Sequence, residues 1–263
     1  MYKSIIVVFF LSVIVACSDI LYDELLSSPS SYPHDSPPKN SLSVATWNIH
    51  GGHTWFGTSN VNNIKREFSN SLSKEDIVFL QEVPQSELLD ELAEKYGYHK
   101  SGTRNAILSK YPILASEVIV INPGTGRTAT WADIEYTDKI AIRIYSIHLS
   151  YKIKRWLYIP VTRGAELKRL IDHAYSFEGP VILAGDFNTT DLIGSKLDKR
   201  PVFQKAYQAG FKNAFLERQC NTHLILGRID WVFYKGMSAW FSGCGIYAGS
   251  DHRHMNGTFF NIN

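Results

Sequence analysis

Polar residues that could do chemistry lie at or just after the ends of several short apolar runs in this sequence. Eight of them have this position: Asn48, Glu82, His148, Asp186, Asn188, Asp230, Asp251 and His252. Open α/β architectures bind ligands at the edge where their strands end, so residues from different strands can meet there. Carboxylates, amides and imidazoles gathered at one point can hold a divalent cation, activate a water and contact an anionic oxygen. One such residue is an ordinary turn residue, whereas eight indicate a site.

Asp186 and Asn188 follow the apolar run 181–184, which has the length and branching of a buried strand. Gly185 lets the chain turn there without a Cβ clash. Residues two apart in an extended chain point to the same side, so a charged acceptor and a neutral amide should converge. Together they suit an anionic oxygen and the cation or proton donor beside it.

Asp230 is flanked by Ile229 and Trp231 inside another apolar run. A buried carboxylate is unfavourable unless a partner offsets its lost hydration. The sequence Asp251-His252 supplies an imidazole that the expected hairpin topology brings near. We therefore predict that Asp230 pairs with His252.

The elements that must position these residues are a mixture of strands and helices. Apolar patterning predicts strands at 42–48, 76–82, 105–109, 113–121, 127–136, 139–149, 181–184, 222–226, 228–234, 239–247 and 255–262. Helical spacing predicts helices at 61–73, 85–96, 161–175 and 202–208. The two strands on either side of Gly227 are expected to form a hairpin.

Length and charge bound the possible functions. With 263 residues, of which 44% are hydrophobic, the chain can bury one large core, and we expect one catalytic domain over residues 42–263. The net charge of +2 leaves no acidic tail and no bulk polycation. A nucleic-acid partner is therefore permitted but not demanded by charge.

Residues 1–17 are a different kind of sequence, with a short basic start and an apolar stretch at 5–15. The stretch is shorter than the roughly 20 residues of a membrane span, so we interpret it as an export signal. Its end at Ala16-Cys17 resembles the lipobox of bacterial lipoproteins, which implies cleavage before Cys17 and lipid attachment to it. An ordinary secretory signal containing a cysteine is the alternative. We expect a cell envelope lipoprotein facing the periplasm or the surface, or a secreted protein without the anchor.

Residues 18–41 are rich in serine and proline, which predicts a tether between the anchor and the domain. Cys220 and Cys244 then remain. In an exported protein they could form a disulfide, or both could be buried and reduced.

Seven short motifs, in order, resemble those of the exonuclease/endonuclease/phosphatase superfamily, which includes deoxyribonuclease I. They are Thr46-Trp-Asn48, Leu80-Gln-Glu82, the segment 105–112, Ser146-Ile-His-Leu149, Gly185-Asp-Phe-Asn188, Arg228-Ile-Asp-Trp231 and Ser250-Asp-His252. The resemblance covers Leu42 to the C-terminus. It implies an α/β (α+β) four-layer sandwich of two packed mixed β-sheets, with helices on the outer faces and the site at one edge.

The resemblance also implies roles for these residues. Glu82 would bind a divalent cation, Mg²⁺ with Mn²⁺ as a possible substitute, with Asn48 and Asp251 as further ligands. Asp230 would orient His252, and either His252 or Asp186 would activate the attacking water. Asn188 and His148 would donate to the phosphate oxygens.

His148 carries some information on the subfamily. A histidine at this point resembles deoxyribonuclease-like and sphingomyelinase-like members, whereas apurinic endonucleases tend to have a tyrosine there, so apurinic repair is disfavoured. The glycine-rich segment 49–57 is longer and more aromatic than we expect for a plain nuclease.

The loop after His148 interleaves basic and aromatic residues. Lys152, Lys154, Arg155 and Trp156 are its candidate substrate-binding residues. Such a composition suits a nucleic-acid groove, and also the headgroup region of a lipid bilayer. We expect a monomeric, metal-dependent phosphodiesterase acting on nucleic acid. The alternatives are a phospholipid or inositol phosphate hydrolase and a non-catalytic surface binding protein on the same fold.

Overall fold

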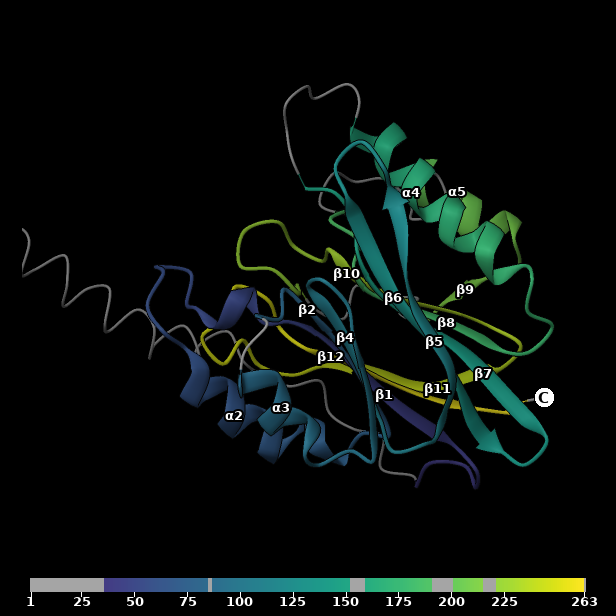
Figure 1. The fold of residues 1–263 in the computed structure, drawn as a ribbon, viewed down its shortest axis with the longest axis horizontal. Coiled ribbons are helices and arrows are strands. Elements are labelled where there is room, and N and C mark those ends of the chain that lie inside the picture. The colour runs from purple at the N-terminus through teal and green to yellow at the C-terminus, as the bar shows by residue number, and fades with distance from the viewer. Residues whose placement is uncertain (1–35, 85–86, 152–158, 191–200, 215–220, 263) are drawn as a thin grey trace, which may run out of the picture.

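The computed structural model describes residues 36–84, 87–151, 159–190, 201–214 and 221–262. Two six-stranded sheets pack face to face, and helices cover the two outer faces (Figure 1). The predicted four-layer sandwich of two mixed β-sheets is confirmed.

The first sheet is built from strands at both ends of the chain. Its strands are β1 (Leu42–Asn48), β2 (Ile77–Gln81), β3 (Tyr98–Ser101), β4 (Asn105–Ser109), β11 (Ser238–Cys244) and β12 (Met255–Phe260). They lie in the order β11-β12-β1-β2-β4-β3. Two helices, α2 (Val61–Asn70) and α3 (Glu87–Ala93), cover its outer face (Figure 1).

The second sheet comes from the middle of the chain. Its strands are β5 (Ile113–Asn122), β6 (Arg127–Thr137), β7 (Ile140–His148), β8 (Val181–Asp186), β9 (Lys212–Asn213) and β10 (Asp230–Lys235). They lie in the order β5-β6-β7-β8-β10-β9. Two helices, α4 (Ile159–Ala174) and α5 (Pro201–Gln208), lie over its outer face (Figure 1).

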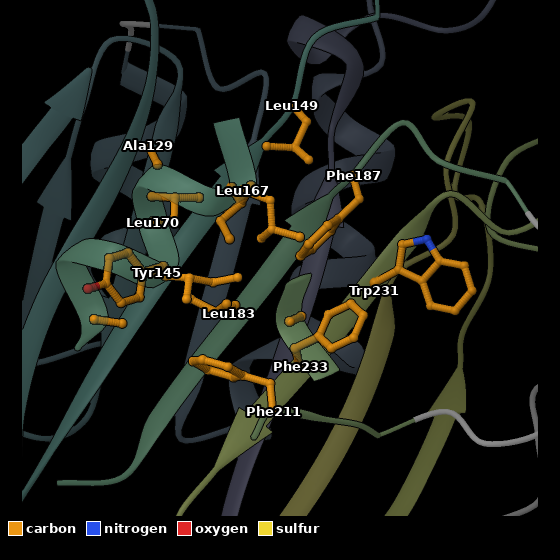
Figure 2. Close-up of a cluster of buried hydrophobic side chains, with 14 of the residues drawn as sticks. Ala129, Tyr145, Leu149, Leu167, Leu170, Leu183, Phe187, Phe211, Trp231 and Phe233 are labelled. Carbon is orange, nitrogen blue, oxygen red and sulfur yellow. The ribbon is translucent and has the colours of Figure 1, made fainter. Parts of the chain in front are cut away.

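The alternation of side chains along each strand produces three apolar layers. In β1, Leu42 and Val44 contribute to the core between the sheets, whereas Ala45 and Trp47 contribute to the core beneath α2 and α3. The layer beneath α4 and α5 contains the outward side chains of β8 and β10, with a cluster of aromatic rings (Figure 2). Because both faces are covered, β2, β4 and β8 are buried along their whole length.

The topology brings the polar strand ends together. β1 and β2 are parallel, with Asn48 opposite Gln81. β7 and β8 are also parallel, with His148 opposite Asp186, and β10 runs antiparallel to β8 with Asp230 opposite the same Asp186. Parallel strands end at a common edge, so both sheets deliver their polar termini to one side of the sandwich.

Most predicted elements are found, but the prediction of a hairpin around Gly227 is wrong. Residues 222–226 form only isolated bridges, and β10 pairs with β8 and β9 instead. The reason is that side chains take the backbone donors: Thr222 Oγ1 accepts from the N–H groups of Ile229 and Asp230.

Three smaller differences are confined to short segments. The first helix ends at Asn70, and a separate 3₁₀ turn, η2 (Leu72–Lys74), follows it. The strands β3 and β9 were not predicted. β3 is an edge strand with mostly exposed polar residues, and β9 has only two residues, so neither carries an apolar pattern.

Several predictions fall on residues outside the described ranges: the export signal 1–17 with Cys17, most of the tether 18–41, the loop residues Lys152, Lys154, Arg155 and Trp156, and Cys220. Cys244 is disulfide-bonded. Among the described residues, no helix is long and apolar enough to cross a membrane.

Candidate active site

Glu82 follows β2 at the sheet edge and has an unusual backbone. Its φ of 54° lies in the left-handed region, which a non-glycine residue adopts rarely. Its carboxylate accepts from Asn48 Nδ2 (3.3 Å) and from Arg104 Nη2 (3.0 Å). The Glu82 side chain is 21% exposed, whereas that of Asp186 is 2% exposed. Glu82 is therefore the more open carboxylate of the two.

Asn48 connects the two sheets. Its Nδ2 also donates to Asp186 Oδ2 at 3.2 Å, while its Oδ1 accepts from the N–H of His50. A carbonyl oxygen has two lone pairs, so this bond leaves one for another partner. Asn48 thus fixes the separation of Glu82 and Asp186.

Asp186 lies at the centre of the constellation. Its Oδ1 accepts from the N–H of Asn188 (2.7 Å), and its Oδ2 lies 3.4 Å from His148 Nε2 and 3.9 Å from His252 Nε2. Burial raises the pKa of Asp186 to about 7, His252 opposes this rise, and Asp230 and Glu82 add to it. A proton on this carboxyl is therefore easily gained and lost near neutral pH.

Asn188 and His148 flank Asp186. Asn188 Nδ2 donates to Leu149 O at 3.0 Å and lies 3.1 Å from Asp186 Oδ2, so protein acceptors surround its amide. His148 Nε2 is also 3.8 Å from Glu82 Oε1. Burial, assisted by the charge of Arg127, holds the pKa of His148 well below its usual value. The ring is neutral, so it has one N–H to donate.

Asp230 and His252 form the closest ion pair of the site. Asp230 Oδ2 lies 2.8 Å from His252 Nδ1, and both side chains are buried. Burial alone would lower the pKa of His252, but Asp230, Asp186 and Asp251 raise it to about 10. Trp47 Nε1 donates to the carbonyl of His252 at 3.0 Å, which anchors the backbone behind the ring. The ring is held with Nε2 at 3.9 Å from carboxylate oxygens of both Asp186 and Asp251.

Asp251 lies on the other side of His252. Its Oδ1 is 3.9 Å from His252 Nε2, and burial together with the charge of Glu82 raises its pKa. The structure therefore brings all eight predicted residues of the constellation to one edge.

The model of one protein family, described as the endonuclease/exonuclease/phosphatase family, matches residues 45–252. This match spans most of the chain and all eight site residues. The chain belongs to the endonuclease/exonuclease/phosphatase family. No curated protein matches it.

Solved structures of the endonuclease/exonuclease/phosphatase fold resemble the chain at low identity. A family protein from Bacteroides vulgatus is 16% identical with a TM-score of 0.67, over 86% of this chain and all (100%) of that one. A family protein from Beutenbergia cavernae is 18% identical with a TM-score of 0.64, over 83% of this chain and 71% of that one. Truncated TDP2 from Caenorhabditis elegans is 22% identical with a TM-score of 0.62, over 84% and 97%. Similarity at this level supports the fold.

The residues present fit a divalent cation of the kind this family generally uses. Four carboxylates, those of Glu82, Asp186, Asp230 and Asp251, gather at one edge and offer hard oxygen ligands. The charge of Glu82 raises the pKa of both Asp186 and Asp251. A cation would relieve this crowding of negative charge, and the carboxylate of Glu82 is the most exposed of the four.

Three residues beside the eight-residue constellation were not predicted from the sequence: His50, Arg104 and His223. His50 Nε2 and His223 Nε2 lie 3.9 Å and 3.7 Å from Asp251 Oδ2, and Arg104 pairs with Glu82. His50, His53, Glu82 and Arg104 also line a shallow pocket of about 500 Å³. Arg104 immediately precedes a predicted strand and His50 lies in the glycine-rich segment, which are weak signals. His223 gave none, because it fell inside the mispredicted strand.

Proposed function

We propose that this protein is a divalent-metal-dependent phosphodiesterase that acts on nucleic acid. The observation that carries the proposal is the orientation of His252, whose Nδ1 is held by Asp230 at 2.8 Å while Nε2 faces Asp186 at 3.9 Å. Two groups that can exchange a proton, the His252 imidazole and the Asp186 carboxyl, thus lie side by side near the open carboxylate of Glu82. This is what in-line attack of water on a phosphate diester requires.

The chain's own residues divide the work as follows. Asp230 orients the His252 ring, and the proton of the attacking water goes either to Asp186 or to His252 Nε2 in those molecules whose imidazole is neutral. The neutral His148 donates to a phosphate oxygen. Glu82, with Asn48 and Asp251, would hold Mg²⁺, or Mn²⁺ in its place, which when bound neutralises charge on the phosphate.

A nucleic-acid substrate is favoured by the cations that surround the edge. Arg104 is exposed, and Arg127 stacks on Tyr151 with its guanidinium carbon 5.5 Å from the ring centroid. Tyr151 begins the basic and aromatic loop at 151–158. Arginine contacts phosphate and aromatic rings stack on bases, so these groups suit a single strand.

A phospholipid is the second candidate, for one specific reason. Trp55, Phe56 and Ile225 are 44%, 53% and 65% exposed, and Trp55 and the 224–227 turn both contact His223 beside the site. Exposed apolar and aromatic residues at a site entrance suit a bilayer surface.

The localisation belongs to the same proposal. An export signal with lipid attachment at Cys17 would place a monomeric enzyme on the bacterial cell envelope, beside both kinds of substrate. Replacement of Cys17 by serine should release the protein from membranes. Unchanged membrane retention would contradict the anchor.

A substrate panel tests the proposed function. We expect the purified protein with Mg²⁺ to cleave plasmid DNA or RNA faster than sphingomyelin vesicles or inositol phosphates. A preference for sphingomyelin would establish the lipid alternative. Absence of hydrolysis of every ester would contradict both.

A further inference from the structure

His223 lies against the Asp230–His252 pair but has no part in the proposed mechanism. Its ring meets that of His252 edge to face, with centroids 5.0 Å apart and an interplanar angle of 89°. Its backbone forms isolated bridges with Gly227 and with His252. The neighbouring Thr222 accepts from Asp230 N–H, so this segment contacts both members of the pair. The His223 side chain is therefore held in place from several directions.

The hydrogen bonds of His223 fix its tautomer. Nδ1 accepts from the N–H groups of Ile225 and Leu226, each at 3.1 Å. A nitrogen that accepts two hydrogen bonds carries no hydrogen, so the neutral imidazole has its hydrogen on Nε2. His223 Nε2 is thus a donor.

This tautomer argues against a role as metal ligand. His223, Asp251 and His252 lie close enough together to resemble a cation site. Coordination through Nε2 would move the hydrogen of His223 to Nδ1, where it would meet two backbone N–H groups. Metal-bound histidines instead donate the hydrogen on their second ring nitrogen to an acceptor.

The donor points into the site without a close partner. Asp251 Oδ2 lies 3.7 Å from Nε2, which is longer than a hydrogen bond, and within the described part of the chain Nε2 has no hydrogen-bond acceptor. The ring of Trp55 stands edge to face at 5.9 Å and covers part of the histidine from solvent. A fixed donor in such a partly dry position contributes more to binding an anion than one in water.

We propose that His223 donates its Nε2 hydrogen to an oxygen of the substrate phosphate group, as a further substrate-binding residue at the Asp251 side of the site. The inference rests on the proposed function, because it needs a phosphate ester held beside His252.

Two substitutions of His223 separate this role from a structural one. Asn places its oxygen where Nδ1 lies and can accept from the 224–227 turn, but it has no group at the position of Nε2. Gln places an amide N–H₂ near Nε2 and loses the acceptor for the turn. We expect His223→Asn to lower kcat/KM for a small synthetic diester about 10- to 100-fold, as expected for loss of a hydrogen bond to a charged group. We expect His223→Gln to stay within about fivefold of the wild type, since it retains such a donor.

The opposite order, with Asn active and Gln impaired, would show that His223 only holds the turn. Equal losses in both variants, or none in either, would also overturn the proposal. Mn²⁺ affinity measured by electron paramagnetic resonance should be unchanged in His223→Asn, and a loss would make His223 a metal ligand instead.

Binding of inorganic phosphate by calorimetry in the presence of Mg²⁺ separates this inference from the proposed function. If the wild type hydrolysed no ester, the proposed function would fail. Weaker phosphate binding by His223→Asn than by His223→Gln would still support the donor, and equal binding would overturn it.

Discussion

At the scale of single residues, the site depends on buried polar groups whose orientations are fixed by their neighbours. Asp230 is the clearest case, because its Oδ2 contacts His252 while its Oδ1 is buried with no hydrogen-bond partner in the described structure. Such a carboxylate is unfavourable for folding. Its position is therefore explained by what it does to His252.

The pairing predicts a strong and non-additive effect on catalysis. Asp230→Asn keeps the shape but removes the charge, and should lower kcat about 10²-fold or more. His252→Ala should lower it at least as much, and the double variant little further, because the two residues act as one unit. Steady-state kinetics measure this, with exposed Asp172→Asn as the control. Additive losses would separate the two residues and leave Asp186 as the base.

Some residues of the site could be predicted from the sequence and others could not. All eight residues of the constellation could be predicted, because each ends or follows an apolar run or matches a family motif. His223, Arg104 and His50 could not, since their roles depend on a turn and a pocket that no periodicity encodes. The same turn explains the wrong hairpin: the side chains of Thr222 and His223 bind backbone N–H groups that a strand would have used.

At the scale of elements, the close approach of β7 and β8 places His148 beside Asp186. Gly185 makes this possible, because its φ is 144° and a Cβ there would overlap the backbone carbonyl of Ile147.

Gly185→Ala should therefore disturb the end of β8. We expect a loss of roughly 2–4 kcal/mol in the free energy of unfolding, together with reduced activity. Urea denaturation measures the loss. Gly57→Ala, at an exposed turn with positive φ where a Cβ meets nothing within 4 Å, controls for backbone strain alone. Equal effects of the two substitutions would contradict the importance of strand contact.

A second element-scale feature is a buried polar network that links α2 to β12. His254 Nε2 bonds Glu67 Oε1 (2.9 Å), and Asn256 Nδ2 donates to Glu75 Oε1 (2.6 Å). Burial raises the pKa of Glu75, against the hydrogen bond from Asn256. The folded state therefore favours the protonated form of Glu75.

This sign predicts how stability varies with pH. The contribution of protonated Glu75 is complete below its unfolded pKa and is lost as the pH rises through the higher folded pKa. Glu75→Gln should remove this dependence, so its Tm relative to the wild type should rise between pH 4 and pH 8, by about 2–4 °C per kcal/mol. Calorimetric scans across this range measure it, with exposed Glu87→Gln as the control. A constant difference in Tm would show that Glu75 does not titrate differently on folding.

At the scale of the whole molecule, two sheets with covered outer faces leave one edge where both can contribute residues. Local patterns could predict the strands and helices but not how the two sheets face each other, because that arrangement depends on contacts between residues far apart in the chain. The four-layer architecture could be predicted only from the family motifs. Edge strands such as β3 escaped because their residues are exposed.

The most direct test of the central proposal measures phosphodiester hydrolysis by the full-length protein after exhaustive chelation, and then with Mg²⁺ or Mn²⁺ added. We expect no turnover in the chelator and full recovery with the metal, because the open ligand Glu82 belongs to a cluster of oxygen donors. Glu82→Gln should need about tenfold or more additional Mg²⁺ for half-maximal activity, whereas exposed Glu94→Gln should behave as the wild type. Full turnover in excess chelator, or an unchanged Mg²⁺ requirement in Glu82→Gln, would contradict a metal-dependent site at this edge.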